Sequence, residues 1–393
     1  MQTEIPGVNM SVVNTGLLLT PNVAIKDASI IIEDGYIKRV IRGEEVGIEK
    51  IKCKECIAVP GFIDLHTHGC EGVDVNYLEN EKDLEKMLKI LPKYGVTTFL
   101  PTTVSLPIDK LKEITEIIYN AASYISEGAE IAGIYFEGPY LNKEKAGAQN
   151  PEYLKNPSLD EAIELYKASR GLMKVMALAP ELPGSSKVIK ELDKLEVIVA
   201  VAHTNATFSE AMKAFDLGAR LCTHIFNGMR VFHHREPGVA MAGLVRDDVY
   251  VEFIGDLIHL HPGTITLIYK NKPLDKVIAI TDSISATGLP DGEYELGGLE
   301  IVVKDGVSRV KKTGSLAGST LTLDKALRNL VFNVGIPLKI ALKFMTENPA
   351  RLLGLKDRGI LRPGYRADIV LLDRKTLEVK MTIIEGEIVY EKE

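Results

Sequence analysis

A repeated alternation of strand-like and helix-like segments between residues 59 and 355 is the feature that most constrains the fold. Segments with helical periodicity, such as residues 81–95 and 209–218, follow or separate short apolar runs of strand type. We count eight such runs: GFIDLHTH, VTTFLPTT, IAGIYFEG, MKVMALAP, VIVAVAHT, ARLCTHIF, VYVEFIGD and VIAITDS. Eight strands in β/α alternation are typical of a TIM-type (β/α)8 barrel rather than an open sheet, so we predict an α/β fold of that kind.

The two ends of the chain have a different pattern. Residues 10–58 contain short β-rich runs separated by turn signals, and residues 366–390 return to short strands. Each end alone is too small to bury a core, so we expect the two to pair into one small β-sandwich lobe. The sequence thus predicts a lobe built from residues 1–58 and 356–393 and a catalytic barrel from residues 59–355.

The composition argues against several classes of partner. The chain of 393 residues has a formal net charge of −7, which disfavours a nucleic acid or an acidic membrane surface but not a small anionic ligand. No apolar run approaches the roughly 20 residues that a membrane span requires. The first ten residues also lack the basic stretch and apolar core of a signal peptide. We therefore expect a cytoplasmic protein.

The four cysteines include one CxxC pair, Cys53 and Cys56. A structural zinc site would need a second CxxC or a histidine pair downstream at close spacing, and neither follows. A redox motif would lie at the start of a helix, whereas this pair precedes an apolar run. Four cysteines are also too few for a disulfide framework. We interpret the pair as incidental.

Metal-ligating side chains end several of the predicted strands. The first strand ends in His66 and His68, which point to the same face because they are two residues apart. Further donors end the third, fifth, sixth and eighth strands, in that order Glu137, His203, His224 and Asp282. In a (β/α)8 barrel these ends converge on the catalytic face, where imidazole and carboxylate groups can bind a divalent metal. The other histidines all fall in loops after the sixth and seventh strands: His233, His234, His259 and His261. The sequence predicts a metal-binding cup.

This arrangement resembles the amidohydrolase superfamily. Many of its members bridge two metals with a carboxylated lysine at the end of strand four, but Lys174 stands at the beginning of that strand here. Glu137, at the end of the third strand, can supply the missing carboxylate. With this substitution, the chain resembles the N-acetylglucosamine-6-phosphate deacetylase family in AHTNAT, THIFNGM, REPG and TDSISATG, and in PGFID, LAGSTLTL and PGYRADIVLLD. The resemblance covers essentially the whole chain.

The resemblance assigns roles to the residues that match the family's motifs. Three residues match its main metal site: Glu137, His203 and His224. Two more, His66 and His68, match additional ligands that only some members keep. The family therefore implies one or two divalent metals per subunit, with zinc as the first choice and iron, manganese or cobalt as alternatives. Asp282 matches the catalytic aspartate.

Substrate-contacting positions can be carried over in the same way. They are Ala148, Gln149, Asn227, Gly228, Arg235, His259, Leu316, Ala317 and Gly318. Gln149 stands where many members carry a histidine that helps to polarise the amide carbonyl, and Gly228 replaces the more usual alanine. The first departure leaves open which group assists the metal at the oxyanion.

The implied reaction is hydrolysis of the acetamide of N-acetyl-D-glucosamine 6-phosphate to D-glucosamine 6-phosphate and acetate, in amino-sugar catabolism and recycling. A bound divalent ion can lower the pKa of its water to about 7 and so supply the hydroxide that attacks. Asp282 acts as general base and then as general acid, because the departing amine is too basic to leave unprotonated.

The resemblance also implies a homodimer, in which Arg235 serves its own or a neighbouring subunit's pocket. An arginine can hold a phosphate through two parallel charge-assisted hydrogen bonds, which a lysine cannot reproduce. The alternative interpretation is a solvated Arg235 that pairs with Glu236.

Two alternative functions remain at this point. A hydantoinase- or dihydroorotase-like cyclic amidase would share the histidine pair and the eighth-strand aspartate, but it needs the lysine that strand four lacks. A non-catalytic scaffold with the amidohydrolase fold should have lost ligands or the aspartate, and this chain keeps them all.

Overall fold

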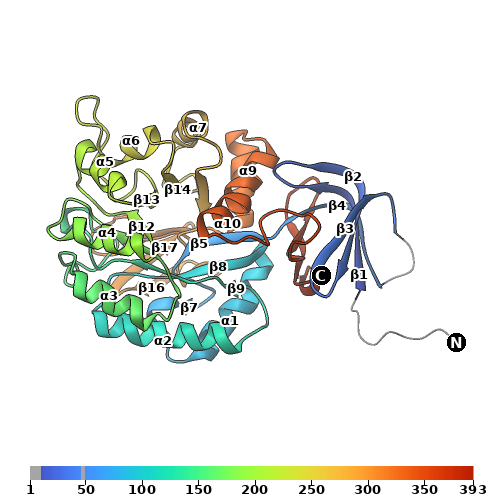
Figure 1. Ribbon diagram of the computed structural model, residues 1–393, viewed down its shortest axis with the longest axis horizontal. Helices are drawn as coiled ribbons and strands as arrows, with labels where there is room; N and C mark the ends of the chain where they lie inside the picture. The colour runs from blue at the N-terminus through green and yellow to red at the C-terminus, as the bar shows by residue number, and fades with distance from the viewer. Residues whose placement is uncertain (1–9, 46–48, 393) are drawn as a thin grey trace.

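All eight predicted barrel strands are present and parallel. The computed structural model describes residues 10–45 and 49–392, and the strands follow one another around the barrel in sequence order (Figure 1). Their bounds are β5 (Phe62–Thr67), β8 (Val96–Thr103), β10 (Ile134–Glu137), β11 (Met173–Leu178), β12 (Ile198–Val201), β13 (Ala219–Cys222), β14 (Tyr250–Ile254) and β15 (Val277–Ile280). The first strand meets the segment after the last, where the Asp282 amide donates to the His66 carbonyl at 2.9 Å. The predicted (β/α)8 barrel is confirmed.

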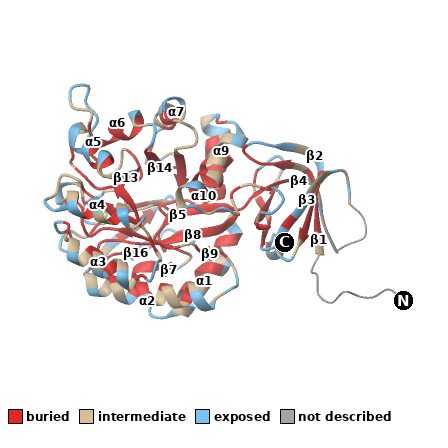
Figure 2. Ribbon diagram, in the orientation of Figure 1, coloured by how far each residue is buried: buried red, intermediate tan, exposed pale blue. Residues whose placement is uncertain are grey.

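Helices cover the outside of this barrel, with their buried sides toward the strands (Figure 2). They are α1 (Glu81–Ile90), α2 (Ile108–Tyr124), α3 (Leu159–Ala168), α4 (Ser185–Lys194), α5 (Phe208–Asp216), α6 (Gly238–Val245), α7 (Pro262–Asn271), α8 (Leu323–Arg328), α9 (Leu338–Met345) and α10 (Glu347–Leu353). Helix α5 illustrates why they form: Thr207 and Glu210 cap its first turn reciprocally, and its apolar face is buried. No helix in residues 10–45 and 49–392 has the length and apolar character needed to cross a membrane.

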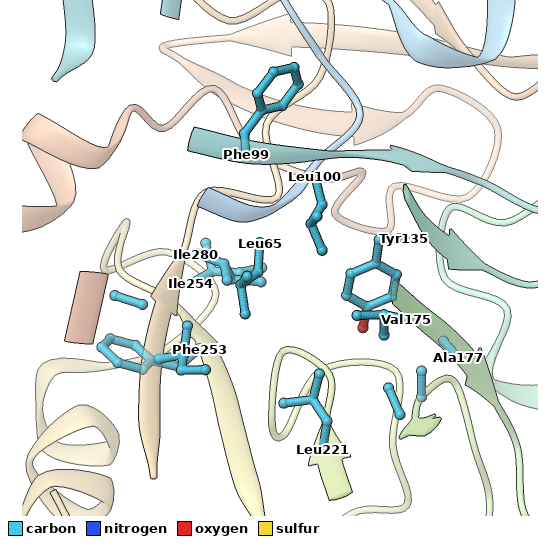
Figure 3. Packing of buried hydrophobic residues seen from close by; sticks show 14 of the residues in the cluster. Leu65, Phe99, Leu100, Tyr135, Val175, Ala177, Leu221, Phe253, Ile254 and Ile280 are labelled. Atoms are coloured by element: carbon cyan, nitrogen blue, oxygen red, sulfur yellow. The ribbon is translucent and has the colours of Figure 1, made fainter. Parts of the chain in front are cut away.

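The barrel strands are rich in apolar residues because both of their faces are largely buried. On β8, the consecutive residues Phe99 and Leu100 point to opposite sides of the strand (Figure 3). Leu100 points toward the side where Tyr135 lies, whereas Phe99 points away from it. All three side chains belong to one continuous apolar core and are fully buried. This packing holds the strand ends, and therefore the side chains on them, in defined positions.

The two chain ends pair, as predicted, into a separate sheet at one end of the molecule (Figure 1). Its seven strands run in the order β21-β20-β19-β4-β1-β2-β3. Their bounds are β1 (Met10–Leu19), β2 (Ala24–Glu33), β3 (Tyr36–Arg42), β4 (Glu49–Pro60), β19 (Ile369–Asp373), β20 (Val379–Ile384) and β21 (Glu387–Glu391). The antiparallel pairing of β19 with β4 joins the two ends. The division into domains at residues 58/59 and 355/356 stays a proposal.

Alternation along β4 attaches this lobe to the barrel. Cys56 and Ala58 belong to a core inside the lobe, whereas Ile57 and Val59 belong to the core of the barrel. Successive residues of a strand point to opposite faces, so one strand can contribute to two cores at once. The lobe and the barrel are thus continuous through buried apolar contacts.

A three-stranded antiparallel sheet follows β15 and was not predicted. It comprises β16 (Gly292–Leu296), β17 (Leu299–Lys304) and β18 (Val307–Val310). The hydroxyl of Tyr77 fastens its first hairpin to the barrel, because it accepts from the Gly298 amide at 2.6 Å and donates to Glu295. The remaining short elements are β6 (Gly69–Cys70), β7 (Val73–Asp74), β9 (Glu130–Ile131), η1 (Val75–Tyr77), η2 (Leu91–Tyr94), η3 (Lys143–Lys145) and the π-helical turn η4 (Asn329–Val334).

The interpretation of Cys53 and Cys56 as an incidental pair is wrong, because the structure joins them in a disulfide with their Cα atoms 5.2 Å apart. In a regular strand, residues three apart would be separated by about 10 Å. Strand β4 bulges here, since Thr15 of β1 pairs with Cys53 while Leu17, two residues on, pairs with Ile57. The bulge shortens the strand and brings the two sulfur atoms together. The spacing of the cysteines in the sequence does not predict this bulge.

Candidate active site

Four imidazoles and two carboxylates from different strands converge at the carboxyl end of the barrel. They form two groups whose ligand atoms lie within 4.8 Å of one another: Glu137 with His203 and His224, and Asp282 with His66 and His68. In the first group, Glu137 Oε1 lies 2.8 Å from His224 Nε2 and 3.2 Å from His203 Nε2. In the second, Asp282 Oδ1 lies 3.1 Å from His68 Nε2. The two groups adjoin, since His66 Nε2 and His68 Nε2 lie 3.7 and 3.3 Å from Glu137 Oε2.

Three of these residues have a positive φ angle, a backbone conformation that residues other than glycine rarely adopt. The φ angles are +38° at His203, +26° at His224 and +52° at Asp282. Such a conformation costs of the order of 1–3 kcal/mol and concentrates at functional sites, where the surrounding structure must hold it. Asp282 is held from two sides, because its amide donates to His66 and its carbonyl accepts from the Ser319 amide at 2.7 Å.

Two of the imidazoles are oriented by backbone carbonyls. His203 Nδ1 lies 2.7 Å from the Lys145 carbonyl oxygen, and His68 Nδ1 lies 3.0 Å from the Thr102 carbonyl oxygen. A carbonyl only accepts, so each Nδ1 must carry the hydrogen. When the ring is neutral, Nε2 therefore carries the lone pair, directed into the cup as metal ligation requires.

The charges of the cup are strongly coupled. Burial raises the pKa of the Glu137 carboxyl, but the charge of His66 and hydrogen bonds from the neighbouring histidines outweigh it, so this pKa lies well below the usual value. Burial likewise raises the pKa of Asp282, and His68 more than offsets that effect, so the net shift is downward. For His68, burial disfavours the charged ring, yet Asp282 and Glu137 raise its pKa to about 9. The carboxylates therefore stay ionised and hold positive charge beside them.

The donor set fits a divalent transition metal. Imidazole nitrogen and carboxylate oxygen suit zinc, iron, manganese and cobalt, whereas a site for calcium or magnesium would be built from oxygen donors. The histidines are buried with their Nε2 atoms toward the carboxylates, so the cup can hold a cation where the metal-free protein holds protons.

A cavity of about 220 Å³ opens onto this cup. It brings together most of the site residues that the sequence predicted: His68, Glu137, Ala148, Gln149, His203, His224, Asn227, Gly228, His259, Asp282, Leu316 and Gly318. His66 is fully buried below it. Four further lining residues, Val104, Gly147, Leu296 and Ser315, were missed. Leu296 ends β16 and Ser315 follows β18, both strands of the unpredicted three-stranded sheet. The pattern of barrel strand ends therefore did not point to them.

Besides His66, two predicted residues lie outside the lining of this cavity. Ala317 is fully buried, and its amide donates to the Ser308 carbonyl at 3.2 Å, so it supports the loop rather than facing the cavity. Arg235 is exposed, and its Nη1 lies 3.0 Å from His234 Nε2. Within the described residues, the single subunit therefore does not bring Arg235 to its own cup.

Close packing leaves no room for a side chain at residue 228. Gly228 has a φ of +61°, and a Cβ atom there would lie 2.8 Å from Nδ1 of His203. The carbonyl of Gly228 also accepts from the Thr204 amide at 2.9 Å, which keeps the backbone close to the ring. Any larger residue would displace the imidazole of His203, which follows β12.

Comparisons with known proteins agree with this site. The model of the amidohydrolase family matches residues 57–389. The chain is 36% identical over 380 residues to an N-acetylglucosamine-6-phosphate deacetylase from Lysinibacillus sphaericus, covering 94% of this chain and 97% of the relative. It is 35% identical over 373 residues to an N-acetylgalactosamine-6-phosphate deacetylase from Escherichia coli O157:H7, with the same coverage.

Solved structures give the same result. The N-acetylglucosamine-6-phosphate deacetylase from Thermotoga maritima is 37% identical with a TM-score of 0.86, covering 97% of this chain and 100% of that one. A mutant of the Mycobacterium smegmatis enzyme in complex with N-acetyl-D-glucosamine-6-phosphate is 31% identical with a TM-score of 0.92, covering 97% and 99%.

A (β/α)8 barrel with histidines and carboxylates at its strand ends defines a class of metal-dependent hydrolases, and this chain belongs to the amidohydrolase family. The relatives and structures described above, which match it over nearly its whole length, are deacetylases of 6-phosphorylated amino sugars. The resemblance predicted from the sequence is confirmed.

Proposed function

We propose that the protein hydrolyses the acetamide of N-acetyl-D-glucosamine 6-phosphate to D-glucosamine 6-phosphate and acetate. One observation carries the proposal: a complete donor set and an ionised aspartate face one cavity, in a chain that its relatives' names link to this reaction. The substrate class is a phosphorylated amino sugar, and the place in metabolism is amino-sugar catabolism and recycling.

The residues can divide the chemistry among themselves. Glu137, His203 and His224 would hold a divalent cation, which supplies Lewis acidity and an activated water. Asp282, whose lowered pKa keeps it ionised, would accept a proton from the attacking water and return it to the departing amine.

His259 is placed to meet the substrate. Its Nδ1 lies 2.7 Å from Asp256 Oδ2, so this nitrogen is committed to the carboxylate and Nε2 is left for the ligand. Because His259 also lines the cavity, we assign it a substrate contact, as the sequence predicted. The histidine that many relatives carry at the position of Gln149 is absent, so His259 is our candidate for the donor to the amide carbonyl.

We propose a second cation site at His66, His68 and Asp282. These three ligands form a separate donor group, and one or two metals per subunit are therefore consistent with the side chains present. Zinc is our first choice, and iron, manganese and cobalt are the alternatives, because imidazole and carboxylate suit all four.

We also propose a homodimer. Large apolar side chains are exposed beside the catalytic cavity, including Val231 (79% exposed), Phe232 and Leu267. Phe232 and Leu267 line a groove of about 340 Å³ that also includes His259, which faces the catalytic cavity as well. A second copy that covers this groove would lie beside the substrate, where the exposed Arg235 of one subunit can serve the other.

The test is an assay of amine release by purified, metal-replete protein. N-Acetylglucosamine 6-phosphate should be hydrolysed far faster than N-acetylglucosamine, with N-acetylgalactosamine 6-phosphate included to measure discrimination at C4. Hydantoin and dihydroorotate serve as controls for a cyclic amidase. Absence of amine release from every sugar, with bound metal verified by elemental analysis, would refute the proposal and favour a non-catalytic scaffold.

A further inference from the structure

A buried glutamate lies beneath the metal cup. It is in the middle of a strand rather than at its end, so the pattern of strand-end ligands does not include it. Glu252 is on β14, in the middle of a fully buried strand, and is itself 0% exposed. Its Oε2 atom lies 3.6 Å from Nδ1 of His66, on the side of the ring that faces away from the cavity. The other ring nitrogen, Nε2, faces Glu137 and Asp282. His66 is therefore situated between carboxylates on both sides.

The surroundings of Glu252 offer it little other compensation. The hydroxyl of Tyr135 donates to Oε2 at 3.5 Å, but it also lies 2.6 Å from the hydroxyl of Thr223. Within residues 10–45 and 49–392, neither Glu252 Oε1 nor His66 Nδ1 has a hydrogen-bond partner. His66 is also the one basic side chain in that range within ion-pair distance of Glu252. A buried carboxylate requires a partner, because an unpaired charge in an apolar interior is strongly unfavourable.

His66 differs in this respect from the other oriented histidines. His68 and His203 each direct Nδ1 at a neutral backbone carbonyl. At 3.6 Å, the Glu252 carboxylate acts on the His66 ring through its charge: it favours a hydrogen on the nearer nitrogen, Nδ1, makes the ring a stronger ligand and adds negative charge below the site. Within the second donor group, His66 therefore has a carboxylate behind its ring, whereas His68 has a neutral carbonyl there.

We propose that Glu252 is a positioning residue that holds the hydrogen of His66 on Nδ1 and directs Nε2 into the cup for the second cation. The inference rests on the proposed second site, but its test does not require the deacetylase reaction. Glu252 touches neither the substrate nor the reacting atoms. It acts through His66 and adds a third buried carboxylate to Glu137 and Asp282, which favours two divalent cations over one.

The experiment measures metal binding to full-length protein without substrate. Zinc is removed and added back in competition with a chromophoric chelator, for the wild type, Glu252→Gln and Glu252→Leu. Loss of an outer partner of a ligating histidine typically lowers metal affinity by about 10- to 100-fold. We expect that loss at the weaker equivalent in Glu252→Leu, a smaller loss in Glu252→Gln, whose amide oxygen still accepts, and an unchanged stronger equivalent.

A double-mutant cycle separates this role from a general effect on the fold. In a His66→Ala background, Glu252→Leu should leave the affinity of the remaining zinc unchanged. The control is Asp368→Asn, which alters another buried carboxylate, paired with Arg366 in the lobe, and should lower thermal stability without changing metal affinity. Equal losses with and without His66, unchanged affinity in Glu252→Leu, or a single zinc equivalent in the wild type would overturn the proposal.

A measurement on metal-free protein covers the case in which Glu252→Leu does not fold. Nitrogen-15 NMR chemical shifts of the histidine rings should report the Nδ1–H form of His66 in the wild type at alkaline pH. In Glu252→Gln that form should decline relative to the Nε2–H form. The same tautomer in both proteins would count against Glu252 as its determinant.

Discussion

The side-chain amide of Gln149 donates a 2.6 Å hydrogen bond to Glu137 Oε2, the carboxylate oxygen opposite the one that faces His203 and His224. The Ser105 amide donates to Gln149 Oε1 at 2.7 Å, so both the position and the orientation of this side chain are determined. Gln149 lines the cavity as the sequence predicted, but its amide is engaged with a metal ligand. We interpret its main role as holding Glu137.

Replacing Gln149 with leucine should therefore weaken metal binding at the main site. Partners of ligating groups are typically worth about 10- to 100-fold in metal affinity, and leucine keeps the volume while removing the donor. Chelator competition on Gln149→Leu measures the effect, with Asn227→Leu, which changes another polar residue of the cavity wall, as the control. Unchanged metal affinity together with a raised KM would assign Gln149 to the substrate instead.

Asp282→Asn should keep substrate binding and the cation at Glu137, His203 and His224, but it should reduce kcat by at least about 100-fold, the low end of general acid–base contributions. The amide has nearly the same shape, but it cannot take a proton from water. Steady-state kinetics of the variant measure kcat and KM, and elemental analysis of the same preparation measures its bound metal. Near-normal turnover, with the cation at Glu137, His203 and His224 retained, would remove Asp282 from the mechanism.

The number of metal ions per subunit depends on His66 and His68, at the end of β5. We expect His66→Ala/His68→Ala to lose one metal equivalent and to retain the other at Glu137, His203 and His224, because the two donor groups use separate histidines. Elemental analysis of dialysed protein gives the stoichiometry, and His233→Ala/His234→Ala in an exposed loop is a matched control. Identical stoichiometry in all three proteins would mean that His66 and His68 are not a ligand pair.

Arg235→Ala should reduce kcat/KM for the phosphorylated sugar by about 10- to 150-fold, since a charge-assisted contact is worth roughly 1.5–3 kcal/mol. The unphosphorylated sugar makes no such contact and should be nearly unaffected, and Arg235→Lys should recover only part of the loss. Parallel assays of both sugars test this. Equal losses on both would indicate a role in the loop or the fold.

Mixed dimers test which subunit Arg235 serves. One protomer would carry Arg235→Ala and the other Asp282→Asn. If Arg235 reaches the neighbouring site, each mixed dimer contains one intact site and activity returns on mixing. If Arg235 serves its own subunit, every site in the mixture lacks one of the two residues and activity stays low.

Metal binding should release protons and weaken as the pH falls. The pKa of His68 is raised to about 9, so this imidazole is protonated at pH 7 in the metal-free protein and must lose its proton to bind a cation. Below pH 9, each displaced proton should lower the apparent affinity by about tenfold per pH unit. Calorimetric titration with zinc in buffers of different ionisation enthalpy gives the number released. A value of zero at pH 7 would contradict the assignment of His68 as a ligand.

Much of the fold and the ligand set could be predicted from local pattern. The eight apolar runs correspond to the eight barrel strands because strands buried on both faces are rich in apolar residues. His66 and His68 share a face because the strand period is two. The ends of parallel strands lie at one face of a barrel, so residues that end different strands were expected to meet, and they do.

The sequence by itself thus determined the barrel, the pairing of the chain ends and the residues of the cup, since each depends on neighbours along the chain or on a rule of topology. Only the tertiary structure decided the distances between strands. Register and barrel closure divide the ligands into two groups, engage Gln149 with Glu137 and place Glu252 against His66. A bulge joins Cys53 to Cys56, and packing leaves Arg235 outside its own cavity. These relationships depend on strand register, bulges and contacts between elements, and local periodicity carries no information about them.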